Sequence, residues 1–281
     1  MTTEKLRYCI FDPTGNITAL VESGVAVKDQ PEVAAGIMDL HPEVEQVGFV
    51  SFADEAAAAE GCPPVSLRMA GGEFCGNATM CAAALYAIRS GLQSSTEVCV
   101  KVSGAGEPLK VSLERTGGDV FAAAVTMPPA KSIDELKLSN GMLTDESALC
   151  LPVVRMGGID HIIIEPDSGF LGLKDNKELA ESLIRGWCSA LEADCLGMMF
   201  LGEGWDLRTL TPLVYVPGAD TMFWENSCAS GSAAAGMYLA AESGTSVDVT
   251  FEEPAGKLRV CSDPAAGQTV LHGAARLVSE H

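Results

Sequence analysis

The sequence is poor in basic residues, in aromatic residues and in histidine. Its 281 residues contain 18 Lys and Arg against 38 Asp and Glu, which gives a formal net charge of −20. This excess of acidic charge argues against binding to nucleic acid or to an anionic membrane surface, because both present phosphate groups. With only four histidines and no Cys-x-x-Cys pair, a zinc site is not expected either.

Long hydrophobic runs are also missing. No stretch reaches the length of about 20 apolar residues that a membrane-spanning helix needs, and residues 1–7 lack the apolar core of a signal peptide. We therefore expect a cytoplasmic protein, in which the ten cysteines are mainly free thiols. The hydrophobic content of 47% is enough for a sizeable core in one large domain or two ordinary ones.

Two of the cysteines stand apart, because each precedes a run of small, apolar residues with helical character. Cys75 comes shortly before the run 78–88, and Cys228 comes shortly before the run 233–241. A helix start exposes unpaired N–H groups and the positive end of the dipole, which bind a carboxylate. The same environment lowers the pKa of a thiol from about 8.5. Matched contexts in the two halves favour a chemical role over buried structure.

The order of elements repeats in the two halves: strands, a cysteine turn, an apolar helix, then more strands. A helix that is apolar on all sides must be surrounded, so we expect an α+β fold of two pseudo-symmetric lobes, each with strands wrapped around a central helix. The lobes span residues 1–129 and 130–267, with the boundary in the proline-containing segment 127–144. Strands are predicted at 6–11, 17–22, 47–52, 65–69, 96–103, 110–114, 120–126, 151–156, 159–164, 196–201, 210–216, 246–251, 258–261 and 268–277, with further helices at 31–40 and 176–191.

If the two helix starts face each other, a carboxylate between them places its α-carbon between the sulfurs. One thiolate could then remove the α-proton from one face while the other thiol protonates the opposite face. This inversion needs no metal, no pyridoxal and no other cofactor, because both groups act as general acid and base. Two other classes stay open: a thiol redox protein, and an amino-acid-binding protein without catalysis.

Three motifs stand out: residues 73–78 around the first cysteine, Gly15-Asn16 in the first hairpin turn, and Cys228 before Ser230-Gly231. Together they resemble the diaminopimelate epimerase superfamily of cofactor-independent racemases and epimerases. A closer resemblance is to the histidine racemases that supply D-histidine for opine metallophores. This resemblance implies the two-cysteine mechanism, interconversion of L- and D-histidine, and a last strand, within 268–281, that returns to the first lobe. The segments that carry it are 12–18, 45–49, 72–80, 101–104, 213–217 and 224–228.

One departure from diaminopimelate epimerase bears on the substrate. In the family that the chain resembles, diaminopimelate epimerase carries a Glu-Arg-Gly motif, and its arginine binds the distal carboxylate of the substrate. At the matching place this chain has Val216-Pro217-Gly218. Valine and proline cannot bind a carboxylate in bidentate fashion. Histidine therefore fits better than diaminopimelate, although diaminopimelate or another amino acid stays an alternative.

The candidate site divides into a catalytic pair and a polar surround. Cys75 and Cys228 are the predicted catalytic pair, and His161 is a possible assisting residue. The predicted substrate-binding residues are Asn16, Gln46, Gly76, Asn77, Glu225, Ser230 and Gly231. Structural interpretations compete for four of these residues: Asn16 as a turn residue, Asn77 as a helix cap, Glu225 as a solvent-facing carboxylate and His161 as a core residue. The expected partner is a small amino acid, and a homodimer is left open.

Overall fold

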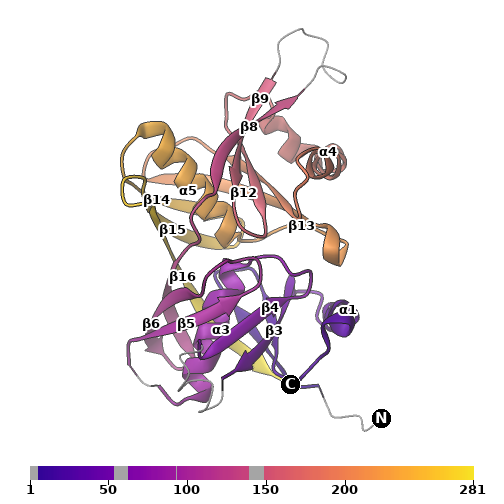
Figure 1. Cartoon of the computed structure of the whole chain (residues 1–281), viewed down its shortest axis with the longest axis vertical. Coiled ribbons are helices and arrows are strands. Elements are labelled where there is room, and N and C mark those ends of the chain that lie inside the picture. Colours follow the sequence, from indigo (N-terminus) through magenta and orange to yellow (C-terminus); the bar gives the residue numbers. More distant parts are fainter. Residues whose placement is uncertain (1–5, 54–62, 93, 139–148) are drawn as a thin grey trace.

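The computed structural model describes residues 6–53, 63–92, 94–138 and 149–281. Figure 1 shows two halves stacked along the long axis, joined by one long strand, β16 (Gln268–Glu280). The first half contains β1 (Tyr8–Asp12), β2 (Thr18–Val21), η1 (Val27–Asp29), α1 (Gln30–Leu40), β3 (Gln46–Phe52), β4 (Val65–Met69), α3 (Gly76–Arg89), β5 (Thr96–Val102), β6 (Leu109–Gly117) and β7 (Val120–Thr126). The second half contains β8 (Ser132–Leu138), β9 (Leu149–Arg155), β10 (Asp160–Ile164), η2 (Leu171–Asp175), α4 (Lys177–Ala190), β11 (Leu196–Leu201), β12 (Leu207–Val216), η3 (Pro217–Ala219), β13 (Thr221–Trp224), α5 (Ala229–Ser243), β14 (Val247–Glu253) and β15 (Gly256–Asp263).

The strands form one mixed sheet that closes on itself in the first half. Neighbouring strands pair in the order β1 to β7, then β16, and β16 pairs with β1 as well. These eight strands, β1–β7 and β16, therefore form a barrel without a free edge. In the second half the order continues from β16 through β15, β14, β12, β11, β10, β9 and β8, with β13 beside β12.

The two alanine-rich helices lie against the inner faces of these strands. Helix α3 contacts β2–β7 and β16, while α5 contacts β9, β10, β11, β14, β15 and β16. Almost every residue of α3 from Gly76 to Ala87 is buried, and so is almost every residue of α5 from Ala229 to Ala240. Because alanine and glycine are small, strands can approach the helices on several sides, and both helices belong to one continuous apolar core.

Two other helices cover outer faces of the sheet. Helix α1 packs on β3 in the first half, and α4 packs on β11 and β12 in the second. Helix α4 has one apolar side, on which Ala180, Ile184, Trp187 and Cys188 are buried in a separate core. The spacing of these buried residues is that of an amphipathic surface helix. No helix of the described residues is both long and apolar enough to span a membrane.

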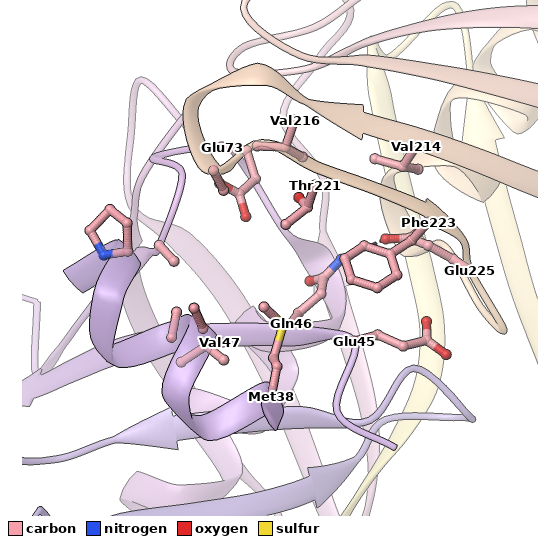
Figure 2. Close-up of a pocket in the computed structure, with 15 residues that line it drawn as sticks. Met38, Glu45, Gln46, Val47, Glu73, Val214, Val216, Thr221, Phe223 and Glu225 are labelled. Carbon is pink, nitrogen blue, oxygen red and sulfur yellow. Dashed lines mark hydrogen bonds between the residues drawn. The ribbon is translucent and has the colours of Figure 1, made fainter. Parts of the chain in front are cut away.

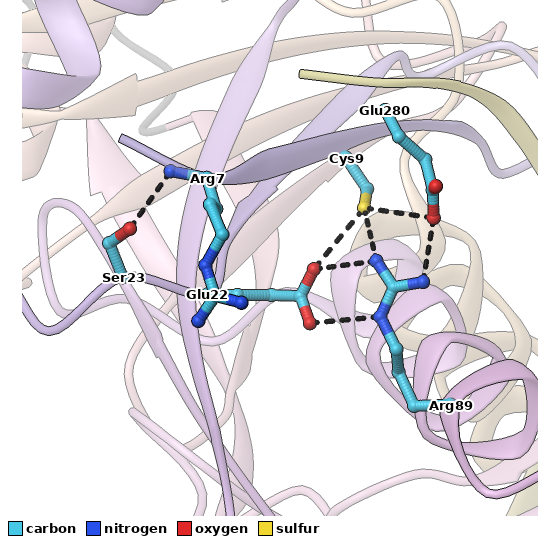
Figure 3. A network of polar contacts seen from close by, with 6 residues as sticks. All are labelled: Arg7, Cys9, Glu22, Ser23, Arg89 and Glu280. Atoms are coloured by element: carbon cyan, nitrogen blue, oxygen red, sulfur yellow. Dashed lines mark hydrogen bonds and ion pairs between the residues drawn. The ribbon is translucent and has the colours of Figure 1, made fainter. Parts of the chain in front are cut away.

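A charged cluster at the far end of α3 ties the barrel together (Figure 3). Arg89, the last residue of the helix, donates to Glu22 from its Nη2 at 2.7 Å and to Glu280 from its Nη1 at 2.6 Å. The Cys9 thiol lies within the same cluster, 3.4 Å from Glu22. The cluster thus joins β1, β2, β16 and α3, and a cation in the last helical turn also offsets the helix dipole.

Most predicted elements are present; some strands, such as β6, β12 and β16, are longer than predicted, and others, such as β2 and β10, are shorter. The hairpin of β1 and β2 is confirmed by their antiparallel pairing, and β4, β7 and β11 have the predicted bounds. One strand was not predicted: residues 132–138 of the proline-containing boundary segment form β8, which pairs with β9. Strand β8 is an exposed edge strand and contains charged residues, so its sequence lacks the apolar pattern of a strand. Residues 139–144 of the boundary segment lie outside the described residues, and so do residues 54–62 of the segment 53–64, for which the sequence predicts a loop or a short helix.

Candidate active site

Each of the two cysteines is the residue that precedes a buried helix, as the sequence predicts. Cys75 is the N-cap of α3 in an extended conformation (φ −135°), and its Sγ accepts the N–H of Ala78 at 3.3 Å. A turn that contains Gly72, with φ +82°, connects the end of β4 to Cys75. Cys228 is the N-cap of α5, also extended (φ −127°), and follows β13. Local sequence therefore places both thiols at helix starts.

The two helix starts touch each other. Asn77 Nδ2 donates to the carbonyl oxygen of Ser227 at 3.0 Å, which links the turn before α5 to the first turn of α3. A Cβ at Gly76 would lie only 2.9 Å from the Cβ of Ala229, so the close approach requires glycine there. Both cysteines line one small cavity of about 300 Å³ between the halves, which we call the thiol cavity.

Two side chains link the surroundings of the two thiols. The Cys75 thiol donates to Gln46 Oε1 at 2.6 Å, and Gln46 Nε2 donates to Glu225 Oε1 at 2.6 Å. The Glu225 carboxylate in turn raises the pKa of the Cys228 thiol, whose Sγ lies 3.6 Å from the Ser230 hydroxyl. Gln46 comes from β3 of the first half and Glu225 from the turn after β13, so this connection spans both halves.

The thiols do not have the lowered pKa that the helix starts predicted. Burial raises the pKa of Cys75, against the lowering effect of the Ala78 and Asn77 N–H groups. Burial likewise raises the pKa of Cys228 well above its ordinary value, and the carboxylates of Glu225 and Glu253 raise it further. In this closed geometry, loss of hydration outweighs the helix dipole. Burial also raises the pKa of Glu225 to about 8.

A buried carboxyl group, which the sequence did not point to, supports the start of α5. Glu253, the last residue of β14, accepts the backbone N–H of Cys228 and the hydroxyl of Ser232. Burial raises its pKa to about 8. Its position fixes the turn that carries Cys228. The predicted strand 246–251 ended before Glu253, so no sequence signal marked this residue.

A second, larger cavity of about 540 Å³ adjoins the thiol cavity (Figure 2), and we call it the side-chain cavity. It lies between α1 and β3 on one side and β12 and β13 on the other. The residues that line both cavities are Gln46, Glu73, Val214, Val216 and Glu225. Val216, which the sequence marked as a substrate-facing position, therefore borders both spaces.

Of the predicted surround, five residues line the thiol cavity: Gln46, Gly76, Asn77, Glu225 and Ser230. Glu225 is buried, with 3% of its surface exposed, so the solvent-facing interpretation is wrong. Asn16 lines neither cavity and donates instead to Glu45 Oε2 at 2.8 Å. Gly231 packs behind Cys228, where a Cβ would lie 3.1 Å from its Sγ.

His161 is not brought to the thiols. It is fully buried in β10 opposite Gly197, it lines neither cavity, and neither ring nitrogen has a hydrogen-bond partner. Burial lowers its pKa to about 3, so the ring is neutral. This arrangement is that of a core residue.

The sequence also left two other carboxyl groups without a role, Glu45 and Glu73. Glu45 precedes Gln46 and is held by Asn16 and Asn226, while Glu73 stands two residues before Cys75. Proximity to Gln46 and Cys75 was the only signal available for either residue. Within the described part of the chain, no cluster of three or more His, Cys, Asp or Glu residues could hold a metal ion.

Comparison with known proteins gives consistent matches over nearly the whole chain. A family model described as the histidine racemase CntK N-terminal domain matches residues 5–280. A histidine racemase of Fusobacterium nucleatum is 32% identical over 242 residues, covering 83% of this chain and 81% of that protein. A histidine racemase of Staphylococcus aureus is 27% identical over 264 residues, covering 93% and 90%.

Solved structures share the fold at much lower identity. A hydroxyproline epimerase from Agrobacterium vitis has a TM-score of 0.68 at 14% identity, covering 100% of this chain and 93% of that one. A PhzF-family phenazine biosynthesis protein from Bacillus anthracis has a TM-score of 0.60 at 13% identity, covering 98% of each. The mixed sheet is thus that of the racemase and PhzF-like proteins.

Proposed function

The chain belongs to the histidine racemase family defined by the CntK N-terminal domain, and from this premise we propose that it interconverts L-histidine and D-histidine. It is an isomerase, in keeping with the histidine racemases that it resembles over more than four fifths of its length. The observation that carries the proposal is the convergence of two helix-start thiols on one buried cavity. Supply of D-histidine to opine metallophore synthesis is the pathway that fits the family.

The proposed reaction inverts the α-carbon with two bases. The substrate carboxylate is bound by the N–H groups at the two helix starts, from Gly76 and Asn77 on one side and Ser230 and Gly231 on the other. The thiolate of one cysteine takes the α-proton, and the electron pair of the broken C–H bond moves into an enediolate. The other thiol then gives its proton to the opposite face. At the end the proton count is unchanged, but the two cysteines have exchanged protonation states.

The same helix starts stabilise the developing charge. Because the N–H groups are fixed by the helices before the substrate arrives, they can stabilise the enediolate with little reorganisation. Closure around the substrate excludes water, which strengthens these interactions. Gln46 and Glu225 orient the two thiols toward the space between them, supported by the contacts of Gln46 with Cys75 and of Glu225 with Cys228. The reaction as proposed needs no cofactor.

The proposal includes a domain organisation. We assign residues 1–129 and the returning strand in 268–281 to an N-terminal lobe, and residues 130–267 to a C-terminal lobe. Each lobe consists of strands around one central helix, and the two are pseudo-symmetric. This is supported by the contacts of α3 and α5 with the strands of their own halves and by the pairing of β16 with β1 and β7. A cytoplasmic location and an amino acid as partner complete the proposal.

The substrate and the mechanism can be tested in one experiment. The protein is incubated in deuterated water with each common amino acid and with LL-diaminopimelate. The enantiomers are then separated on a chiral column, and their deuterium content is measured by mass spectrometry. We expect D-histidine from L-histidine, with one solvent deuterium in the product and almost none in the remaining substrate at low conversion. Diaminopimelate as the best substrate would contradict the histidine assignment. Extensive early deuteration of remaining L-histidine would contradict two separate bases.

A further inference from the structure

The side-chain cavity lies next to the thiol cavity. Five residues line both, so a group attached to an α-carbon between the sulfurs can extend into it. The thiol cavity holds the reacting atoms, and the adjoining space is the place where a side chain is recognised.

The walls of the side-chain cavity combine apolar side chains with carboxyl groups. Met38, Val47, Val216 and Phe223 supply the apolar part, and three carboxyl groups supply the acidic part. Among the described residues that line it there is no Lys or Arg. A ligand side chain that brings its own N–H donor is therefore favoured, and one that brings a second carboxylate is disfavoured.

Two of the three carboxyl groups are already occupied within the protein. Glu45 accepts from Asn16 at 2.8 Å and from the backbone N–H of Asn226 at 3.2 Å. The other Glu45 oxygen, Oε1, accepts from Asn226 Nδ2. Glu225 accepts from Gln46 at 2.6 Å. A ligand donor at either group would therefore compete with contacts that hold the turn before α5.

Glu73 differs from both. Its Oε2 is buried and has no hydrogen-bond partner, although the residue lines both cavities. In Figure 2 its carboxyl group points from the turn before Cys75 into the space above Gln46 and Val47. A buried carboxylate oxygen without a partner costs free energy, unless a ligand supplies the missing donor.

We infer that Glu73 is the specificity-determining residue, which accepts an N–H of the substrate's imidazole ring in the side-chain cavity. The inference rests on the proposed function, because it presumes a substrate whose α-carbon lies between the two thiols. The imidazole of histidine is one methylene group away from that carbon, and Glu73 is two residues from Cys75. Phe223 and Val216 then lie beside the ring, and Glu73 Oε2 gains the partner that it lacks.

The test compares two ligands that differ in the ring N–H. L-histidine is the substrate, and 3-(2-thienyl)-L-alanine, which has a five-membered ring without N–H, is the competitor. We measure the KM for histidine and the inhibition constant of the thienyl compound for wild type, Glu73→Leu and Glu73→Gln. Glu114→Gln, an exposed substitution on β6 far from both cavities, is the control. Thermal unfolding of each variant monitors folding.

We expect Glu73→Leu to raise the KM for histidine about ten- to a hundredfold, since a buried polar contact is lost. The inhibition constant of the thienyl compound should stay unchanged or fall. Glu73→Gln keeps one carbonyl acceptor, so its KM for histidine should lie between those of Glu73→Leu and wild type. The KM of Glu114→Gln should match that of wild type.

Equal weakening of both ligands in Glu73→Leu, or no change for either, in a protein that racemises histidine would overturn the role of Glu73 and leave the proposed function intact. A wild-type protein that prefers another amino acid would overturn the proposed function, and the role of Glu73 with it. The two failures are therefore distinguishable in one set of measurements.

Discussion

The starts of α3 and α5 place a cysteine in the same backbone position but beside different neighbours. Cys75 Sγ receives the N–H of Ala78 and lies beside the neutral amide of Gln46. Cys228 lies between two carboxyl groups, Glu225 and Glu253, which both raise the pKa of its thiol. Carboxylates raise the pKa of both thiols, since Glu225 and Glu73 act on Cys75 as well, but only Cys75 accepts an N–H of its own helix. Symmetry of the fold therefore does not make the thiols equivalent, and we expect Cys75 to be the better carrier of the thiolate.

The largest expected effect comes from removing either sulfur. Cys75→Ala and Cys228→Ala should each lower racemisation about 10²- to 10⁴-fold, the range of one acid–base group. Each variant should still exchange the α-proton of one enantiomer for deuterium, and the two variants should act on opposite enantiomers. Cys228→Ala, which keeps Cys75, should exchange faster. Exchange of the same enantiomer in both variants would remove the distinction between the two helix starts.

The next effect concerns the stability of the start of α5. Glu253→Gln replaces an acceptor of two buried donors with a group that can accept only through its carbonyl oxygen, so one donor loses its partner. We expect a loss of about 1–3 kcal/mol in the free energy of unfolding, measured by urea titration. The adjacent exposed substitution Glu252→Gln is the control and should stay within about 0.5 kcal/mol. Equal losses would show that Glu253 gives α5 no particular support.

A pH dependence follows from the raised pKa of Glu225. In the folded protein this pKa is about 8, against an ordinary value of 4.5, so the folded state holds a proton that the unfolded state releases between these values. Its stabilisation is complete below pH 4.5 and is lost as the pH rises toward 8. Glu225→Gln should therefore flatten the fall in unfolding free energy between about pH 5 and pH 8. A parallel fall in wild type and variant would contradict the burial of this carboxyl group as the cause.

The smallest effect belongs to the opposite ends of the same helices. Helix α3 ends at Arg89 in a charged cluster, whereas α5 ends with Gly244 in a left-handed conformation (φ +65°). Arg89→Gln should cost about 1 kcal/mol, because the pairs are partly exposed. The loss should shrink in 1 M salt, which screens exposed charges. A loss that is independent of salt would assign the role of Arg89 to packing instead of charge.

The sequence was sufficient for features set by neighbouring residues and insufficient for those set by distant pairs. Cys75 and Cys228 were recognisable because the helix start and the apolar run are both local, and the hairpin of β1 and β2 follows from one turn. The pKa of the thiols was predicted in the wrong direction, since it depends on burial by both halves. Glu253 reaches Cys228 across 25 residues and Gln46 reaches Glu225 across 179. Such contacts leave no periodic pattern.

The double pairing of β16 has a consequence for synthesis of the protein. In β1, Cys9 pairs with Glu280 of β16, and in β7, Thr126 pairs with Val270. During translation the first seven strands leave the ribosome long before their eighth neighbour exists, so both edges of the nascent sheet stay open. Open edges invite pairing with other chains. Completion of the barrel in the first half thus waits for residues 268–280.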